Sequence, residues 1–281
     1  MKIRAIAGCL CLIVISSTGF AQVMTSSGTG QMKGASMLIN PDGNSFTVTA
    51  TYGPPVFSVA LVTGAPFSAE EIASQTRELP DGNRIAHAMP SVFLYRDAAG
   101  RTRTDRPAVL MSPNPTFAAN IPLIPEIYDP IAGYQYFLDT FNRVAHRYKI
   151  LPSTVLLHRV DGVISGPGNG ENAPAFVNEP LGKKMIEGIE AEGRRTTATY
   201  PVGMMSNDKP MTTVTEYWNS TDLKVTVYMK SESSSTGENL RALINIKRAQ
   251  PDPSLFQVPP EYTVVDETGT FTTPFTVPKK D

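Results

Sequence analysis

The residues that could support catalysis or metal binding are few and widely spaced. The chain has three histidines, His87, His146 and His158. No two of them have the close spacing of a zinc-ligand pair. His146 falls on the apolar side of an alternating stretch, which favours a packed core histidine over a ligand. The serine-hydrolase signature G-x-S-x-G is absent from the sequence. We therefore assign no catalytic residue, no metal site and no cofactor.

Two groups of charged residues suggest other chemistry. A glycosidase uses two carboxylates across a cleft, and three acids lie close together between positions 187 and 192. Their spacing favours the solvated face of a strand. A basic cluster lies between positions 96 and 106. It favours a charged edge or outer face of a sheet, with contact to an anionic head group as the alternative. The acids are Glu187, Glu190 and Glu192, and the basic residues are Arg96, Arg101, Arg103 and Arg106.

Aromatic residues are the candidate ligand-binding groups. They are concentrated in stretches that have a strand pattern, and on a curved sheet some would pack in the core. The others would line a concave apolar groove, which is a common form of small-molecule site. The candidates are Tyr134, Tyr136, Tyr148, Trp218 and Tyr228.

Strict alternation of apolar and polar residues predicts the elements that carry these groups. Alternation places one set of side chains on a core and the other toward water, and sheets with one wet face are usually antiparallel. Short segments containing Asp, Asn and Gly separate the alternating stretches, as expected for hairpin turns. The clearest alternating stretches are 45–52, 143–150, 223–230 and 240–247.

Helix signals are scarce. Ser68 precedes Glu70 and Glu71, which predicts the start of a short helix. Residues 251–256 predict one helical turn or an extended corner. Proline-rich residues 107–126 and glycine-rich residues 161–180 predict two long irregular excursions. We expect a flexible leader at 22–40 and a single β-rich domain at 41–275.

The N-terminus predicts export. Lys2 and Arg4 precede an apolar run that ends in small residues, the pattern of a signal peptide at 1–21 that is cleaved near Ala21. The apolar run is shorter than the roughly 20 residues of a membrane span. Both cysteines, Cys9 and Cys11, lie within it. The mature chain would then contain no disulfide and would reside in the periplasm or at the cell surface, peripheral to the membrane rather than integral to it.

The charge balance argues against a nucleic-acid partner. Removing Lys2 and Arg4 lowers the 25 basic residues to 23, against 26 acidic ones, so the formal charge moves from −1 to −3. A nucleic-acid-binding protein needs a basic footprint, and this chain carries none.

Several short motifs resemble uncharacterised bacterial exported proteins. The run from Pro251 to Tyr262 is similar to the D-x-S-L-F-x-x-P-x-x-Y ending of the periplasmic lipoprotein-carrier-like (LolA-like) superfamily. Further motifs of this kind lie at 96–101, 129–133, 187–193 and 216–218. The resemblance implies a mainly β fold with a single large curved antiparallel sheet, an unclosed half-barrel, and few short helices. It also implies binding of a lipid or a lipoprotein acyl chain.

The leading functional hypothesis is a non-enzymatic envelope protein that binds a hydrophobic group on a concave sheet face. The alternative is a structural or protein-interaction module of the envelope, with an envelope protein as its partner. A hydrolase that uses carboxylates or a Ser–His pair is the third hypothesis, and it requires those groups to converge in one cleft.

Overall fold

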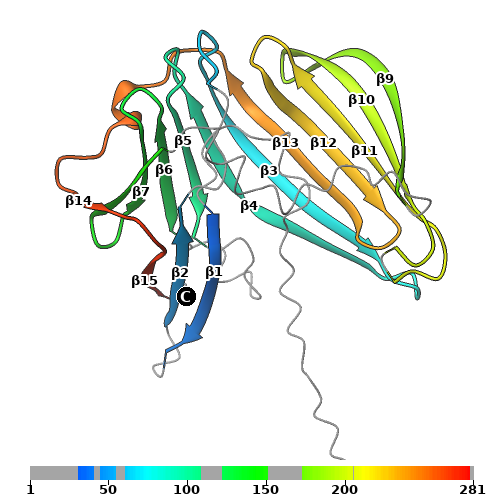
Figure 1. Cartoon of the computed structure of the whole chain (residues 1–281), viewed down its shortest axis with the longest axis horizontal. Coiled ribbons are helices and arrows are strands. Elements are labelled where there is room, and N and C mark those ends of the chain that lie inside the picture. Colours follow the sequence, from blue (N-terminus) through cyan, green and yellow to red (C-terminus); the bar gives the residue numbers. More distant parts are fainter. Residues whose placement is uncertain are drawn as a thin grey trace, which may run out of the picture.

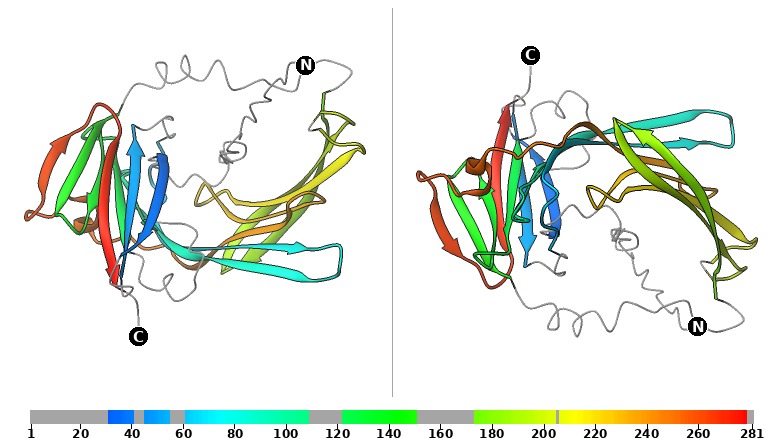
Figure 2. Two further views of the ribbon diagram at one scale, coloured as in Figure 1. Left: turned by 90° about the horizontal axis from the view of Figure 1, so that it is seen from below. Right: turned by 90° about the horizontal axis from the view of Figure 1, so that it is seen from above.

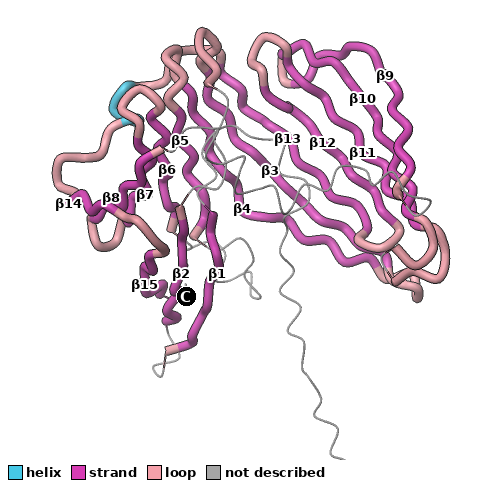
Figure 3. Tube along the Cα trace, viewed as in Figure 1, coloured by secondary structure: helices cyan, strands magenta, loops and turns pink. Residues whose placement is uncertain are grey.

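The computed structural model describes residues 31–40, 45–54, 61–108, 122–150, 173–204 and 206–278. Strands make up most of this part of the chain, and its single helical element is a short 3-10 turn (Figure 3). Residues 1–30 lie outside it, so the signal peptide expected at 1–21 stays a prediction. The same holds for the glycine-rich stretch at 161–172.

The strands form two sheets. The small sheet has the order β1-β2-β15, and the large sheet has the order β14-β8-β7-β6-β5-β4-β3-β13-β12-β11-β10-β9. The small sheet comprises β1 (Gln31–Ile39), β2 (Ser45–Gly53) and β15 (Phe271–Pro278). The large sheet comprises β3 (Phe67–Glu78), β4 (Arg84–Arg96), β5 (Thr102–Pro107), β6 (Leu123–Asp129), β7 (Tyr134–Asp139), β8 (Val144–Lys149), β9 (Ala175–Ile186), β10 (Ile189–Tyr200), β11 (Met211–Ser220), β12 (Val225–Ser233), β13 (Gly237–Lys247) and β14 (Thr263–Asp266).

The large sheet is an open, strongly curved layer. Neighbouring strands pair antiparallel, except for β14, which runs parallel to β8. Seen along the strands, the sheet bends into an open curve whose two ends do not meet (Figures 1 and 2). The half-barrel predicted from the sequence is therefore confirmed. A second sheet that joins both ends of the described chain was not predicted.

The small sheet packs inside one limb of this curve. It lies against the inner side of strands β5 to β8 (Figure 2). Aromatic rings form the contact: between ring centroids, Phe137 of the large sheet lies 5.3 Å from Tyr52 and 5.7 Å from Phe271 of the small sheet. Each such pair contributes about 0.5–1.5 kcal/mol beyond the area it buries. This limb is consequently a closed sandwich.

The outer side of the same limb is covered by the segment that follows β13. This segment contains the 3-10 turn η1 (Pro253–Phe256), which confirms the predicted turn at 251–256. Val258 and Tyr262 pack on the cluster formed by Ile127, Leu138 and Ala145. The run at 251–262 therefore covers the back of the sheet.

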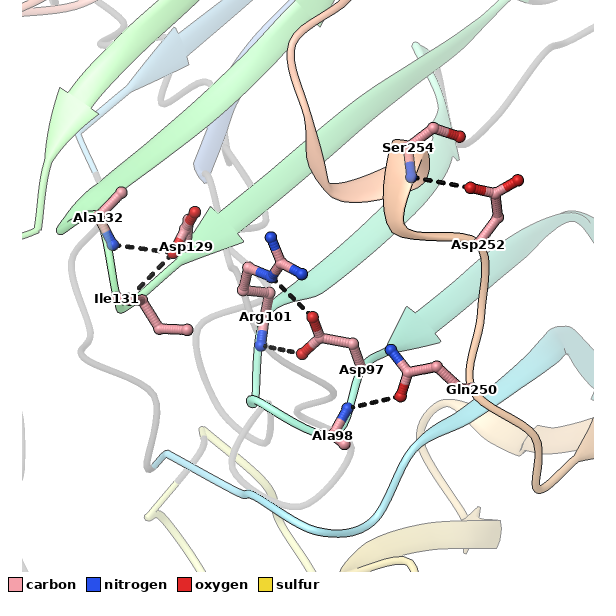
Figure 4. A network of polar contacts seen from close by, with 9 residues as sticks. All are labelled: Asp97, Ala98, Arg101, Asp129, Ile131, Ala132, Gln250, Asp252 and Ser254. Carbon is pink, nitrogen blue, oxygen red and sulfur yellow. Dashed lines mark hydrogen bonds and ion pairs between the residues drawn. The ribbon is translucent and has the colours of Figure 1, made fainter.

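Aspartates close the hairpin turns of this limb (Figure 4). Asp129 Oδ1 accepts hydrogen bonds from the backbone N–H groups of Ile131 and Ala132 at 3.0 and 2.9 Å. Asp97 accepts the backbone N–H of Arg101 at 2.8 Å and its Nε at 2.6 Å. Such side chains satisfy the backbone donors that a tight turn leaves unpaired, which explains why the Asp-rich punctuation predicted the turns correctly.

Three expectations differ from the structure. Residues 68–71 belong to strand β3. Phe67 and Ala69 are buried while Ser68 and Glu70 are not, and pairing of the strand with both β4 and β13 outweighs the local helix signal. Strand β1 occupies the second half of the expected leader, because β2 supplies its ladder partner. The irregular excursion expected at 107–126 ends in β6. Pro125 is tolerated there because pairing with β7 begins only at Glu126.

Asp139 ties the last turn of the sandwich to the small sheet, and its replacement tests this link. Asp139 accepts backbone hydrogen bonds from Phe141 and Asn142, and a further one from the Thr273 hydroxyl on β15. Burial raises its pKa, but these hydrogen bonds outweigh burial and lower the pKa below 3.8. We expect Asp139→Ala to lower the free energy of unfolding by about 2–3 kcal/mol in urea titrations at pH 7.

The matched control is Asp129→Ala, which removes a similar turn carboxylate without a bond to the small sheet. We expect it to cost about 1 kcal/mol. Because the pKa of Asp139 is lowered by folding, its contribution is present above pH 3.8 and is lost as the pH falls through the folded-state value. Equal losses for the two variants would contradict the proposed link.

Candidate functional site

The inner side of the large sheet can be followed across strands from the sandwich. Ile124 and Phe137 face the small sheet and so mark the concave side. Cross-strand partners point to the same side, as do residues two apart on one strand. The concave side can therefore be traced from β6 to β13 through successive cross-strand pairs. These are Ile124–Arg106, Thr104–Leu94, Leu94–Ala69 and Glu71–Leu243.

A single row of side chains crosses the concave side of the other limb. Its residues are direct partners on six neighbouring strands: Arg194, Tyr217, Met229, Arg241, Ala73 and Met89. The two arginines are exposed, and the four other residues are half-buried. The row therefore holds two apolar stretches, each next to an arginine.

An apolar floor adjoins this row toward the sandwich. Phe67, Ala69, Leu94 and Leu243 lie on the same side of the sheet and are at most 6% exposed. Val92 packs on them and is half-buried. In the described part of the chain, no second sheet covers this limb as β1-β2-β15 covers the other (Figure 2).

Charged residues with buried side chains also lie on the concave side, and Glu71 is next to the floor. Glu71 lies 3.7 Å from Arg241, and its side chain is 13% exposed. Burial raises the pKa of Glu71, while Arg241 and Arg106 oppose that rise. Arg106 forms a 2.9 Å ion pair with the buried Glu126. The concave side is thus amphipathic, whereas the sequence predicted an apolar concave groove.

The predicted aromatic candidates do not lie together. Tyr134 and Tyr136 point to the outer side of the sandwich limb, where Arg147 stacks on Tyr134 at 4.5 Å. Tyr148 lies beneath the small sheet and donates a hydrogen bond to the Gly269 carbonyl at 2.6 Å. Trp218 and Tyr228 are cross-strand partners on the face opposite to Tyr217 and Met229, and the apolar cluster that contains Phe67 and Leu94 extends to them.

Tyr217 and Met229 are the concave residues that sequence reasoning missed. Each is the chain neighbour of a predicted candidate, Trp218 or Tyr228, and therefore points to the opposite face. The alternation of side chains along the strands could have separated Tyr217 and Met229 from Trp218 and Tyr228. It could not have assigned the inner face, because that depends on where the small sheet packs.

The arginine cluster is paired within the fold. Arg101 and Arg103 form ion pairs with Asp97 and Asp105, both at 2.6 Å. Arg96 is buried and donates hydrogen bonds to the backbone carbonyls of Ala65 and Leu223. These partners favour a structural role over contact with an anionic head group.

His146, Glu190 and Glu192 agree with their simpler interpretations, and His158 lies outside the described residues. His146 stacks on Phe271 with centroids 3.8 Å apart, and its Nδ1 lies 2.8 Å from Glu267. Glu190 and Glu192 are exposed on β10. Among the residues that the structure describes, no group of three His, Cys, Asp or Glu side chains could hold a metal ion. No described helix is long and apolar enough to cross a membrane.

The fold and this face define an open, curved β-sheet protein with one closed and one open limb. No protein-family model and no curated protein matches the chain. Among solved structures, an uncharacterised conserved protein from Thermus thermophilus is similar at 9% identity and TM-score 0.36, over 72% of this chain and 91% of that one.

Two further similar structures have more informative descriptions. One is the Mycobacterium tuberculosis lipoprotein LppX, at 11% identity and TM-score 0.31, over 67% of this chain and 90% of that one. The other is a LolA superfamily protein from Nitrosomonas europaea, at 11% identity and TM-score 0.27, over 70% and 91%. LolA superfamily structures are thus among those that this chain resembles, as the sequence predicted.

The face of the sheet that carries Trp218 offers a test of the register through the only tryptophan of the chain. The Trp218 ring lies against Gly193, where an added Cβ would come within 2.6–2.8 Å of three ring atoms. We expect Gly193→Ala to displace the indole, move its fluorescence emission to longer wavelength, and cost about 1–3 kcal/mol of unfolding free energy.

Gly269→Ala is the matched control, because a Cβ at Gly269 would meet no atom within 4 Å. It should leave the emission unchanged. An unshifted spectrum for Gly193→Ala would show that Trp218 does not cover Gly193 in solution.

Proposed function

We propose that this is a non-enzymatic exported protein of the periplasm or cell surface that binds a lipid or the acyl chain of a lipoprotein. The binding face is the concave side of strands β10 to β13 with β3 and β4. The observation that carries the proposal is the row Arg194, Tyr217, Met229, Arg241, Ala73 and Met89, whose apolar members lie half-buried beside an apolar floor.

The row suits an amphiphile better than a purely apolar ligand. Tyr217 and Met229 offer a surface for a hydrocarbon chain, and burial of such surface yields about 25 cal/mol per Å². Arg194 and Arg241 lie on either side of that pair. A guanidinium group binds phosphate or carboxylate with two parallel hydrogen bonds. The arrangement therefore supports a ligand with an apolar chain and an anionic end.

An interaction module of the cell envelope is the second candidate. The observation in its favour is the long exposed edge strand β9 at one end of the large sheet. A sheet edge can accept a further strand from another chain.

Variants on opposite faces of the sheet test the binding face. Met229 and Leu240 are both half-buried, but they lie on opposite sides, since Met229 pairs with Arg241, the neighbour of Leu240. We expect Met229→Asp to weaken binding of dansyl-undecanoic acid at least about tenfold, because a carboxylate would replace an apolar contact. Leu240→Asp should change the affinity by less than about twofold.

Native mass spectrometry of the full chain, extracted gently from its own envelope, complements the titration. The expected result is a bound species with the mass of a lipid, lost in Met229→Asp and retained in Leu240→Asp. A chain without bound lipid and without affinity for the probe would refute the proposal.

A further inference from the structure

Strand β9 leaves a long edge of the large sheet without a described neighbour. It is the terminal strand in the sheet order, and β10 is its only partner among the strands that the structure describes. None of its twelve residues is buried. Phe176, Val177 and Met185 are 46%, 58% and 64% exposed. Edges of this length are a ready template for strand pairing.

The edge is interrupted at one point only. Leu181 has no partner on β10, and Gly182 has a positive φ of 77°, so the strand bulges just after Pro180. Bulges and prolines limit unspecific pairing of edges. By contrast, the opposite edge of the sheet, β14, is only four residues long. The two regular halves of β9, residues 175–179 and 183–186, remain suited to pairing.

Opposite charges occur on the two halves of β9, on the same side of the sheet. Glu179 is the partner of Arg195, and Lys184 is the partner of Ala191. Arg195 and Ala191 are four residues apart on β10 and so share one face. Glu179 and Lys184 therefore share that face as well. Val177 and Ile186 lie on it too, through their partners Thr197 and Ile189.

Neither charge forms a close ion pair among the residues that the structure describes, although the ammonium group of Lys184 lies over the Trp218 and Tyr228 rings. Arg195 is 2.7 Å from Glu216 but 3.8 Å from Glu179. The Nζ atom of Lys184 lies 3.7 Å from the centroid of the Trp218 ring. Its neighbour Lys183 is different, because it forms an ion pair with Glu190 at 2.9 Å.

We propose that β9 is a docking edge for β9 of a second copy of this chain, paired antiparallel about a two-fold axis. With Glu179 opposite Lys184 of the second copy, the same register places Val177 opposite Ile186 of that copy. Symmetry repeats both contacts. Each charge then faces its opposite and each apolar side chain faces another, so a second copy complements this edge. In this dimer the two copies touch through β9, so the concave side of each copy keeps the residues and exposure described above.

A charge-reversal cycle tests the register. Sedimentation of the full chain over a range of concentrations should show a reversible dimer. We expect Glu179→Lys and Lys184→Glu each to raise the dimer dissociation constant about tenfold or more, since each places like charges opposite one another twice. The double variant should restore the wild-type value within about threefold, because the pairs are re-formed with exchanged signs.

Lys183→Glu is the matched control, because it makes the same charge change one residue away on the opposite face. It should leave dimerisation unchanged. Circular dichroism and Trp218 fluorescence verify that each variant is folded. A wild-type chain that stays monomeric at every concentration, or a double variant as weak as the singles, would overturn the proposal. Pairing of β9 with a strand of a different protein, while the wild-type chain stays monomeric, would overturn it as well. Probe binding to the concave face reports separately on the proposed function.

Discussion

The aromatic contact between the two sheets determines how the rest of the molecule is arranged. Tyr52, Phe271 and Phe137 lock β2 and β15 onto the inner side of β5 to β8. This contact decides which face of the large sheet is inside at that limb. Side chains alternate along a strand and cross-strand partners share a face. The same contact therefore determines which side chains of β13, β12, β11 and β10 face inward. The face carrying Tyr217 and Met229 is thus defined by packing on the opposite limb.

The sequence predicts the periodic features of this structure and misses the long-range ones. Alternation located the strands around Phe46, Tyr148, Val225 and Ala242, and turn residues located their hairpins. It could not say that Tyr217 rather than Trp218 faces inward, because both choices satisfy a period of two. The short capping signal at Ser68 misled for a related reason, because a twelve-residue strand with a neighbour on each side outweighs a local preference. The candidate binding face therefore required the register.

Charge is used differently in the two limbs. In the closed limb, arginines form ion pairs with neighbouring acids: Arg103 pairs with Asp105, and Arg106 pairs with Glu126. Those pairs satisfy polar groups that the sandwich buries, where an unpaired charge would be costly. In the open limb, Arg194 and Arg241 keep exposed side chains beside apolar ones, although Arg241 also lies 3.7 Å from Glu71. The ion pair of Arg106 with Glu126 in the closed limb is more buried, while the two arginines of the row in the open limb are exposed.

The small sheet has one further consequence, which concerns the order of events during synthesis. Its central strand β2 lies between β1, a few residues away in sequence, and β15, with Thr51 and Thr272 paired across 221 positions. A ribosome releases β2 long before β15, so β2 lacks its second partner until the residues of β15 have emerged. Contacts of such large sequence separation form slowly. The sandwich limb is therefore completed late, after β15 has been synthesised and has paired with β2.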